Sequence, residues 1–391
     1  MYKNFENKKL INTRISTNSK KWSRYTNETI PFWIADMDFK SPEFLVKDII
    51  ERAKKNYFGY TDIPKELKDN IYEWYKITKH VEINKEDIIF STSVLNSYET
   101  ILDAFLEKND KILFFTPIYT QLMNIATKNY NLVEYDMEEY PYTIDFDLLE
   151  KKLDELEEIK SIILCNPHNP IGKLWTETEL LKLTSICRER NILLISDEIH
   201  SDLIYENEVF ISLCCFMEEY DDKMFVLSSP GKTFNVSGFK AAYIISSSKS
   251  TNYVRSKIKE KRYNEIDIFS LVAMNSLYKN RDLSLEWLNN INGKIENNYK
   301  IVKNYLKESN RVYIPEVQST YLIWIKIENS SCKNSEEMRK ILIEKYSIDL
   351  HEGTIFGSSG KYYLRMNIAC PKNILIIGLK RLKLALDNND I

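Results

Sequence analysis

Residues 161–172 (SIILCNPHNPIG), 191–200 (NILLISDEIH) and 223–235 (KMFVLSSPGKTFN) share one pattern, a short apolar run followed at once by polar residues. Short apolar runs bounded by turn-forming residues are typical of buried strands. The residues that follow parallel strands lie together at one edge of an α/β sheet, where ligands bind. The pattern therefore predicts an α/β fold with a polar site at the ends of these three strands.

Apolar runs and amphipathic segments alternate on either side of these segments. The expected strands are residues 87–91, 111–115, 161–165, 191–196, 223–228 and 241–246, and the expected helices are residues 97–107, 118–128 and 177–190. Such alternation predicts a largely parallel sheet covered by helices. After about residue 266 we expect a smaller α+β unit, with helices at 283–309 and 336–345 and strands at 320–326 and 362–367.

The composition is that of a globular protein. Of the 391 residues, 43% are hydrophobic and 28% are charged, which excludes a disordered or fibrous protein. The net charge is -3 and the basic residues are dispersed, so we expect no nucleic-acid partner. Neither a signal peptide nor a membrane-length apolar stretch is evident, which predicts a cytoplasmic protein without a membrane partner. The six cysteines lack C-x-x-C spacing and the four histidines are far apart, so no metal site is expected.

The loop after residues 223–228 carries Lys232 within the sequence SSPGKTFN. Its position at the carboxyl end of a strand places the amine where α/β sheets bind ligands. For this motif alone, an ordinary surface lysine on a Ser/Gly loop remains the alternative.

Two further polar residues follow strands in the same way. Asp197 ends an apolar run, and a carboxylate buried there needs a cationic partner. A protonated pyridine nitrogen would serve, because the carboxylate would keep such a ring able to accept electrons from a carbanion. A solvated strand-end aspartate is the alternative. Asn169 lies in a proline-rich loop that is rigid enough to aim its amide at an acceptor such as a ring oxygen.

Taken as a set, NPHNPIG, SDEIH, SSPGKTFN and YYLRMN resemble the fold-type I pyridoxal 5′-phosphate (PLP) enzymes, the aspartate aminotransferase superfamily, over essentially the whole chain. The segments WIADMDF (33–39), FGYT (58–61), DEIHSDL, KTFNVSG, TYLIW (320–324) and LRMNIACP are similar to the MalY/PatB-type cystathionine β-lyases. The resemblance implies a large PLP-binding domain, residues 46–285, with a mostly parallel seven-stranded sheet. A smaller α+β domain would comprise residues 1–45 and 286–391.

The resemblance also implies roles around the cofactor ring. Lys232 would hold PLP as a Schiff base and Asp197 would pair with the pyridine nitrogen. Asn169 would donate to the phenolic oxygen, and His200 would adjoin that oxygen. Tyr119 would stack on the ring, take part in catalysis and, with Asn169, contact the substrate.

At the phosphate, the resemblance implies the backbone of Ser93, Val94 and Leu95 at a helix start, the Ser229 hydroxyl and the Lys240 ammonium. Relatives usually have glycine where this chain has Ser93, and aminotransferases often have arginine where it has Lys240. An ordinary Ser/Thr helix cap is the alternative for the helix start.

Arg365, within YYLRMN, would grip the substrate α-carboxylate. Tyr60, within FGYT, would reach the phosphate in a neighbouring subunit, which implies a homodimer with shared active sites.

The implied reaction is β-elimination from a cysteine S-conjugate such as cystathionine to a thiol, pyruvate and ammonia. Transamination stays open as an alternative, because nothing in composition or spacing separates the two outcomes. A PLP-bound module that restrains a regulatory protein and a PLP-free structural protein are further alternatives.

Overall fold

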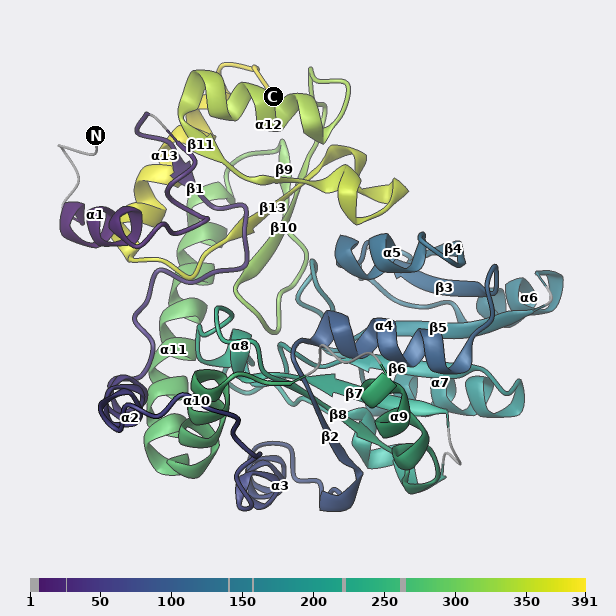
Figure 1. The fold of residues 1–391 in the computed structure, drawn as a ribbon. Helices are drawn as coiled ribbons and strands as arrows, with labels where there is room; N and C mark the ends of the chain where they lie inside the picture. Colours follow the sequence, from purple (N-terminus) through teal and green to yellow (C-terminus); the bar gives the residue numbers. More distant parts are fainter. Residues whose placement is uncertain (1–6, 26, 140, 157, 220–222, 261–264) are drawn as a thin grey trace.

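The computed structural model describes residues 7–25, 27–139, 141–156, 158–219, 223–260 and 265–391. These residues form a large α/β unit around a seven-stranded sheet and a smaller unit around a four-stranded sheet (Figure 1). The cavity described below lies at the edge of the larger sheet that holds the carboxyl ends of its parallel strands.

The larger sheet is mostly parallel. Its strands are β2 (Ile88–Ser91), β3 (Lys111–Thr116), β4 (Asn131–Asp136), β5 (Ile159–Cys165), β6 (Leu193–Asp197), β7 (Met224–Ser228) and β8 (Ala242–Ser246). Their order across the sheet is β2-β8-β7-β6-β5-β3-β4, and β8 runs antiparallel to both of its neighbours. This confirms the expected α/β fold with a mostly parallel seven-stranded sheet.

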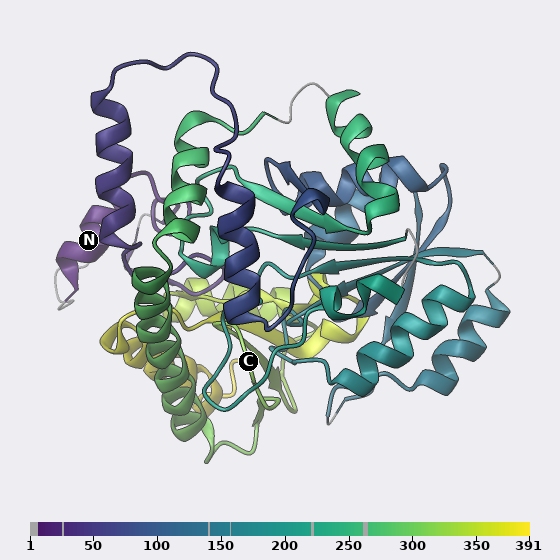
Figure 2. The same cartoon turned by 90° about the horizontal axis from the view of Figure 1, so that it is seen from below.

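Helices cover both faces of this sheet (Figure 2). One face packs against α4 (Val94–Phe105), α5 (Thr120–Ala126) and α9 (Ser248–Glu260). The other face packs against α3 (Leu67–Thr78), α6 (Phe146–Glu155), α7 (Glu177–Glu189) and α10 (Ile268–Lys279). Leu193 and Ile195 of β6 enter the first core and Leu194 enters the second. Because both faces are buried, the strands are nearly continuous apolar runs.

The smaller sheet is antiparallel, with the order β12-β13-β10-β9. Its strands are β9 (Val312–Tyr313), β10 (Leu322–Ile327), β12 (His351–Glu352) and β13 (Tyr363–Asn367). The accompanying helices are α11 (Arg281–Leu306), α12 (Ser335–Tyr346) and α13 (Lys372–Asp387). The sequence pattern did not predict α13. The domain boundary expected between residues 285 and 286 falls within the first turns of α11.

The amino-terminal segment lies against this smaller unit (Figure 1). It contains α1 (Lys8–Ser16) and β1 (Ile30–Pro31), and β1 pairs in parallel with β11 (Ile348–Asp349). The chain then passes through α2 (Glu43–Lys54) into the large unit, whose short helix α8 (Pro230–Thr233) follows β7. Short 3-10 helices lie at Lys85–Asp87, Leu213–Glu219, Gly353–Phe356 and Ser358–Tyr362. Within the described ranges, no helix combines the length and apolarity that a membrane span requires.

Candidate active site

A cavity of about 230 Å³ lies where β2, β3, β5, β6 and β7 end. The predicted residues that line it are Ser93, Val94, Leu95, Tyr119, Asn169, Asp197, His200, Ser229, Lys232 and Lys240. Segments separated by more than a hundred residues therefore meet at one site, as expected for the carboxyl edge of a parallel sheet.

Lys232 lies in α8, immediately after β7. The Ser229 side chain caps this helix and Pro230 occupies its first turn, which directs the chain sharply away from the sheet. The Lys232 Nζ donates to the carbonyl oxygen of Ala35 at 2.7 Å. Loss of hydration is the main cause that lowers the Lys232 pKa to about 8, although the nearby Asp36 carboxylate acts in the opposite direction. The amine therefore loses its proton more readily than an exposed lysine does.

Asp197 is the last residue of β6 and is 6% exposed. The Ile199 backbone N–H donates to its Oδ1 at 3.1 Å, and burial raises its pKa to about 6 despite this bond and the positive Lys232. Among the described residues, Asp197 forms no ion pair. A buried carboxylate that faces a cavity without its own cation is suited to a cationic ligand group.

Arg365 and Asn169 form a second polar group beside the cavity. Arg365 is 2% exposed, and its Nη1 donates to Asn169 Oδ1 at 3.1 Å. The Nη2 group contacts the Trp33 carbonyl at 2.9 Å and the His351 ring at 3.1 Å. Its Nε has no partner, and within the described part of the chain no carboxylate pairs with the guanidinium. Burial lowers the Arg365 pKa to about 10. A buried cation in this state is suited to an anionic ligand.

His200 and Tyr119 complete the ring-sized part of the cavity. His200 is 4% exposed, and its buried Nδ1 has no hydrogen-bond partner among the residues that the structure describes. Its imidazole packs edge-on against Tyr321 with ring centroids 5.9 Å apart. Burial and the positive charges of Lys232 and Arg365 hold the His200 pKa well below its usual range, so the ring is neutral. Tyr119 stands at the start of α5, and burial raises the pKa of its hydroxyl.

The start of α4 forms another wall of the cavity. Ser93 precedes the helix with φ -164° and ψ 157°, and its Oγ accepts from the Asn96 backbone N–H at 3.1 Å. This extended backbone is accessible to any residue, so serine in place of glycine causes no strain here. The first-turn N–H groups of Val94 and Leu95 lie at the positive end of the helix dipole, which favours an anion such as a phosphate.

Ser229 and Lys240 differ in how far they match their expected roles. The Ser229 hydroxyl donates to the Ala241 carbonyl at 2.8 Å and accepts from the Gly231 N–H at 3.1 Å. Its proton is therefore already engaged in the fold rather than aimed at a ligand. Lys240 lines the cavity with an exposed side chain, as a phosphate-binding cation would.

Tyr60 does not reach this cavity. It is fully exposed and lies along a separate surface groove with Phe58 and Ile63.

Sequence reasoning missed several residues that contact the site, among them Ala35, Trp33 and Tyr321. Ala35 and Trp33 act through their backbone carbonyls, and Tyr321 acts through its ring. All three belong to segments that resemble the family, WIADMDF and TYLIW, but the apolar letters of these segments do not reveal backbone contacts.

The residues present fit PLP. Within the described part of the chain, Asp197 has no ion-pair partner, and a pyridinium would supply one; the His200 Nδ1 likewise has no hydrogen-bond partner there, and a ring oxygen would supply one. Lys232 offers an amine with a lowered pKa, and the start of α4 offers N–H groups for a phosphate. In the described ranges, no group of three or more His, Cys, Asp or Glu side chains could hold a metal ion.

Comparisons with known proteins agree with this geometry. The profile of the family described as aminotransferase class I and II matches residues 28–381. The chain is 30% identical to cystathionine beta-lyase PatB of Bacillus subtilis, over 95% of this chain and 98% of the relative. Cystalysin from Treponema denticola, whose crystal structure contains PLP, has a TM-score of 0.89 at 28% identity over 96% of this chain and 97% of its own. The PLP-bound C-S lyase from Staphylococcus hominis has a TM-score of 0.83 at 27% identity over 94% and 96% of the two chains.

Proposed function

Because the chain belongs to the aminotransferase class I and II family, we propose that it is a PLP-dependent C–S β-lyase. It cleaves cystathionine or another cysteine S-conjugate to a thiol, pyruvate and ammonia. The observation that carries this proposal is the convergence of Lys232, Asp197 and Asn169 on one cavity, with Arg365 bonded to Asn169. The similarity to the cystathionine beta-lyase PatB and to the C–S lyase from Staphylococcus hominis favours elimination over transamination.

The cofactor would be held by residues from several strand ends. Lys232 would hold it covalently, Asp197 would keep its pyridine nitrogen protonated, and the start of α4 together with Lys240 would bind its phosphate. Asn169 and His200 would contact the ring oxygen. When bound, PLP supplies an electron sink for the charge that develops at the substrate Cα.

Arg365 and Asn169 would bind the substrate carboxylate. The Arg365 guanidinium is buried and fixed by the Trp33 carbonyl, so it can grip two oxygens without reorganising. Asn169 Oδ1 already accepts from Arg365, which leaves the Asn169 amide N–H groups to donate to a ligand. The two residues would therefore fix which bond at Cα faces Lys232.

Lys232 would move the proton. When its Nζ is free of the cofactor and unprotonated, it would take the Cα proton, and the electron pair of the C–H bond would form a bond between Cα and Cβ as the C–S bond breaks. The sulfur leaves with the electron pair of the C–S bond, and the Lys232 ammonium can return the proton to it. The remaining three-carbon unit reacts with water to give pyruvate and ammonia.

We propose that two copies of the chain form a homodimer. Tyr57, Phe58 and Tyr60 are 81%, 55% and 103% exposed, which is unusual for neighbouring aromatic residues. A second copy would cover them and receive Tyr60 at its cavity. Sedimentation analysis tests this assembly, and a monomer at every concentration would contradict it.

The cytoplasm is the proposed compartment. All six cysteines lie within the described ranges and none is part of a disulfide, as is usual in a reducing environment.

The function is tested by incubating the purified, PLP-loaded protein with L-cystathionine and no keto-acid acceptor. Release of pyruvate, ammonia and free thiol in equal amounts is expected. If a keto acid is needed before any product forms, the protein is an aminotransferase. The Lys232→Ala variant is the control for cleavage that does not use this site.

A further inference from the structure

A segment of the amino-terminal region closes one side of the cavity. This segment, residues 34–39 (IADMDF), is called the strap below. Its Ala35 lines the cavity, and the Ala35 carbonyl oxygen accepts from Lys232 Nζ at 2.7 Å. The strap is therefore the part of the chain against which the uncombined Lys232 amine rests.

Asn367, at the end of β13, grips the strap on both sides of Ala35. Its Nδ2 donates to the carbonyl oxygens of Ile34 at 2.7 Å and Asp36 at 2.9 Å. Its Oδ1 accepts from the Ala369 N–H at 2.8 Å, and the residue is fully buried. Every polar atom of this amide is thus used, which fixes its orientation.

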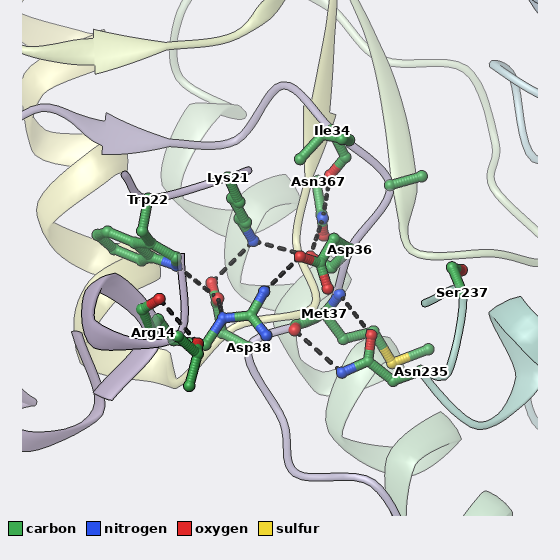
Figure 3. Close-up of polar contacts among 12 residues, drawn as sticks. Arg14, Lys21, Trp22, Ile34, Asp36, Met37, Asp38, Asn235, Ser237 and Asn367 are labelled. Carbon is green, nitrogen blue, oxygen red and sulfur yellow. Dashed lines mark hydrogen bonds and ion pairs between the residues drawn. The ribbon is translucent and has the colours of Figure 1, made fainter. Parts of the chain in front are cut away.

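Asn235 grips the next part of the strap (Figure 3). Its Nδ2 donates to the carbonyl oxygens of Met37 at 3.1 Å and Phe39 at 2.8 Å, and its Oδ1 accepts from the Met37 N–H at 3.1 Å. The Ser41 hydroxyl donates to the Asn235 carbonyl at 3.0 Å. Asn235 lies three residues after Lys232, so the loop that carries the amine and the strap that receives it are joined directly.

Ion pairs and hydrogen bonds from the amino-terminal segment hold the outer side of the strap (Figure 3). Lys21 is fully buried, and its Nζ donates to Asp38 Oδ2 at 2.8 Å and to the Asp36 carbonyl at 2.9 Å. The Trp22 indole N–H donates to Asp38 Oδ1 at 2.8 Å, and Arg14 pairs with the Asp36 carboxylate. The amino-terminal segment thus closes around the strap from the side opposite Asn235.

We propose that Asn235 and Asn367 are positioning residues for Lys232, because they hold the strap so that its Ala35 carbonyl receives the Lys232 amine. The inference rests on the proposed function, in which Lys232 is the reactive amine. The Asp36 N–H donates to the Ile34 carbonyl at 2.9 Å, which holds the peptide group between residues 35 and 36 directly. The two asparagines bind the carbonyls of residues 34, 36, 37 and 39 and so hold the peptide groups on either side of it.

If the strap is no longer held in place, the pKa of the Lys232 amine should change. A carbonyl acceptor favours the ammonium form, since the charged amine is the stronger donor. The charged and titratable groups that face this amine are Asp36, Asp197, Arg365, Lys240 and His200. Asp36 belongs to the strap itself, and its carboxylate also favours the ammonium. A strap that is no longer held in place therefore moves the Ala35 carbonyl and the Asp36 carboxylate away from the amine, and the pKa of Lys232 should fall.

The test uses cofactor-free protein and PLP alone. Capture of PLP requires the unprotonated Lys232 amine, so the rate at which visible absorbance appears after PLP is added, measured across pH, reports the protonation midpoint of that amine. For Asn235→Gly and for Asn367→Ala we expect the midpoint to move to lower pH by roughly half to one unit. Glycine is chosen at Asn235 because its φ is 55°, a conformation that alanine adopts only with strain.

The matched control is Asn191→Gly. Asn191 also has a left-handed backbone, φ 57°, but it lies in an exposed turn before β6, so its midpoint should equal that of the wild type. Each of the two asparagine variants tests the proposal separately, so the test can be made with either one that folds, as judged by circular dichroism. An unchanged or raised midpoint in a folded variant overturns the proposal. A protein that captures PLP with these shifts but releases no pyruvate from cystathionine contradicts only the proposed function.

Discussion

Asp197 and Glu198 are neighbours at the carboxyl end of β6, but their surroundings are opposite. Glu198 is fully buried and accepts from Ser196 Oγ at 3.2 Å, Ser212 Oγ at 2.7 Å and the Leu213 N–H at 2.9 Å. Asp197 has the single Ile199 N–H and faces the cavity. Burial raises both pKa values, to about 7 for Glu198 and about 6 for Asp197.

The buried cations show the same contrast. Lys79 is paired with Asp202 at 2.5 Å, and the Thr233 hydroxyl also donates to Asp202 at 2.8 Å. Arg365 has no carboxylate partner among the described residues and contacts Asn169 instead. The buried cation away from the cavity pairs with a carboxylate of the fold, whereas the buried cation beside the cavity has no such partner among the described residues and is available to an anionic ligand. Mutations on the two sides should therefore separate activity from stability.

The largest effect is expected for Lys232→Ala. Loss of the group that moves the Cα proton should lower kcat by about a thousandfold or more. Pyruvate release from cystathionine measures this, with Lys307→Ala, an exposed lysine at the end of α11, as the control. The variant should remain folded, and a wild-type rate would exclude Lys232 from the reaction.

Asp197→Asn should reduce kcat by roughly a hundredfold, because the amide no longer holds a pyridine nitrogen protonated. The free energy of unfolding of the cofactor-free protein should not fall, since a carboxylate whose charge burial disfavours is removed. Chemical denaturation and pyruvate release measure the two effects. A stability loss with intact activity would place Asp197 with Glu198 as a structural group.

Arg365→Ala should lower kcat/KM by roughly 10- to 100-fold, the worth of charged hydrogen bonds to a carboxylate. Most of the change should be in KM if the carboxylate is bound equally in the ground and transition states. Arg365→Lys keeps the positive charge but lacks the planar guanidinium, so its kcat/KM should lie between those of the wild type and Arg365→Ala. Equal kcat/KM values for all three proteins would remove Arg365 from the substrate site.

The smallest effect is a pH dependence of stability that belongs to Glu198. Burial raises its pKa in the folded protein to about 7, above the usual value for a glutamate. Its contribution to stability is therefore fully present below the unfolded pKa and is lost as pH rises through the folded pKa. Between about pH 5 and about pH 7 the wild type should lose roughly 2 kcal/mol more than Glu198→Gln.

Denaturation curves at several pH values measure this difference. The kcat/KM of Glu198→Gln should stay near that of the wild type, because Glu198 does not line the cavity. Identical pH slopes in the two proteins would show that Glu198 titrates as an exposed carboxylate does.

The sequence pattern located most of the large sheet but missed β4. In β4 (Asn131–Asp136) only Tyr135 is buried, so this edge strand lacks the apolar run that marks its neighbours. The pattern likewise did not reveal that β8 runs antiparallel, since the apolar content of a buried strand is the same in either direction.

The sequence motifs likewise predict part of the candidate site but not all of its contacts. Lys232, Asp197 and Asn169 follow strands, and their motifs alone predict that they lie at one edge of the sheet. The bond between Met37 and Asn235, 198 residues apart, has no such local signal. The hydrogen bond from the Ser229 hydroxyl to the Ala241 carbonyl also has no local signal in the sequence, because it depends on how two loops approach each other.

The amino-acid sequence is enough to predict the alternation of buried strands and helices and the position of the polar motifs after three strands. These are local properties, because burial of apolar runs and turn chemistry act over a few residues. The tertiary structure adds that Glu198 accepts three hydrogen bonds where Asp197 accepts one, that Arg365 contacts Asn169, and that the strap receives the Lys232 amine. Each of these depends on the distance between groups far apart in the chain, and burial makes that distance decisive for their charge.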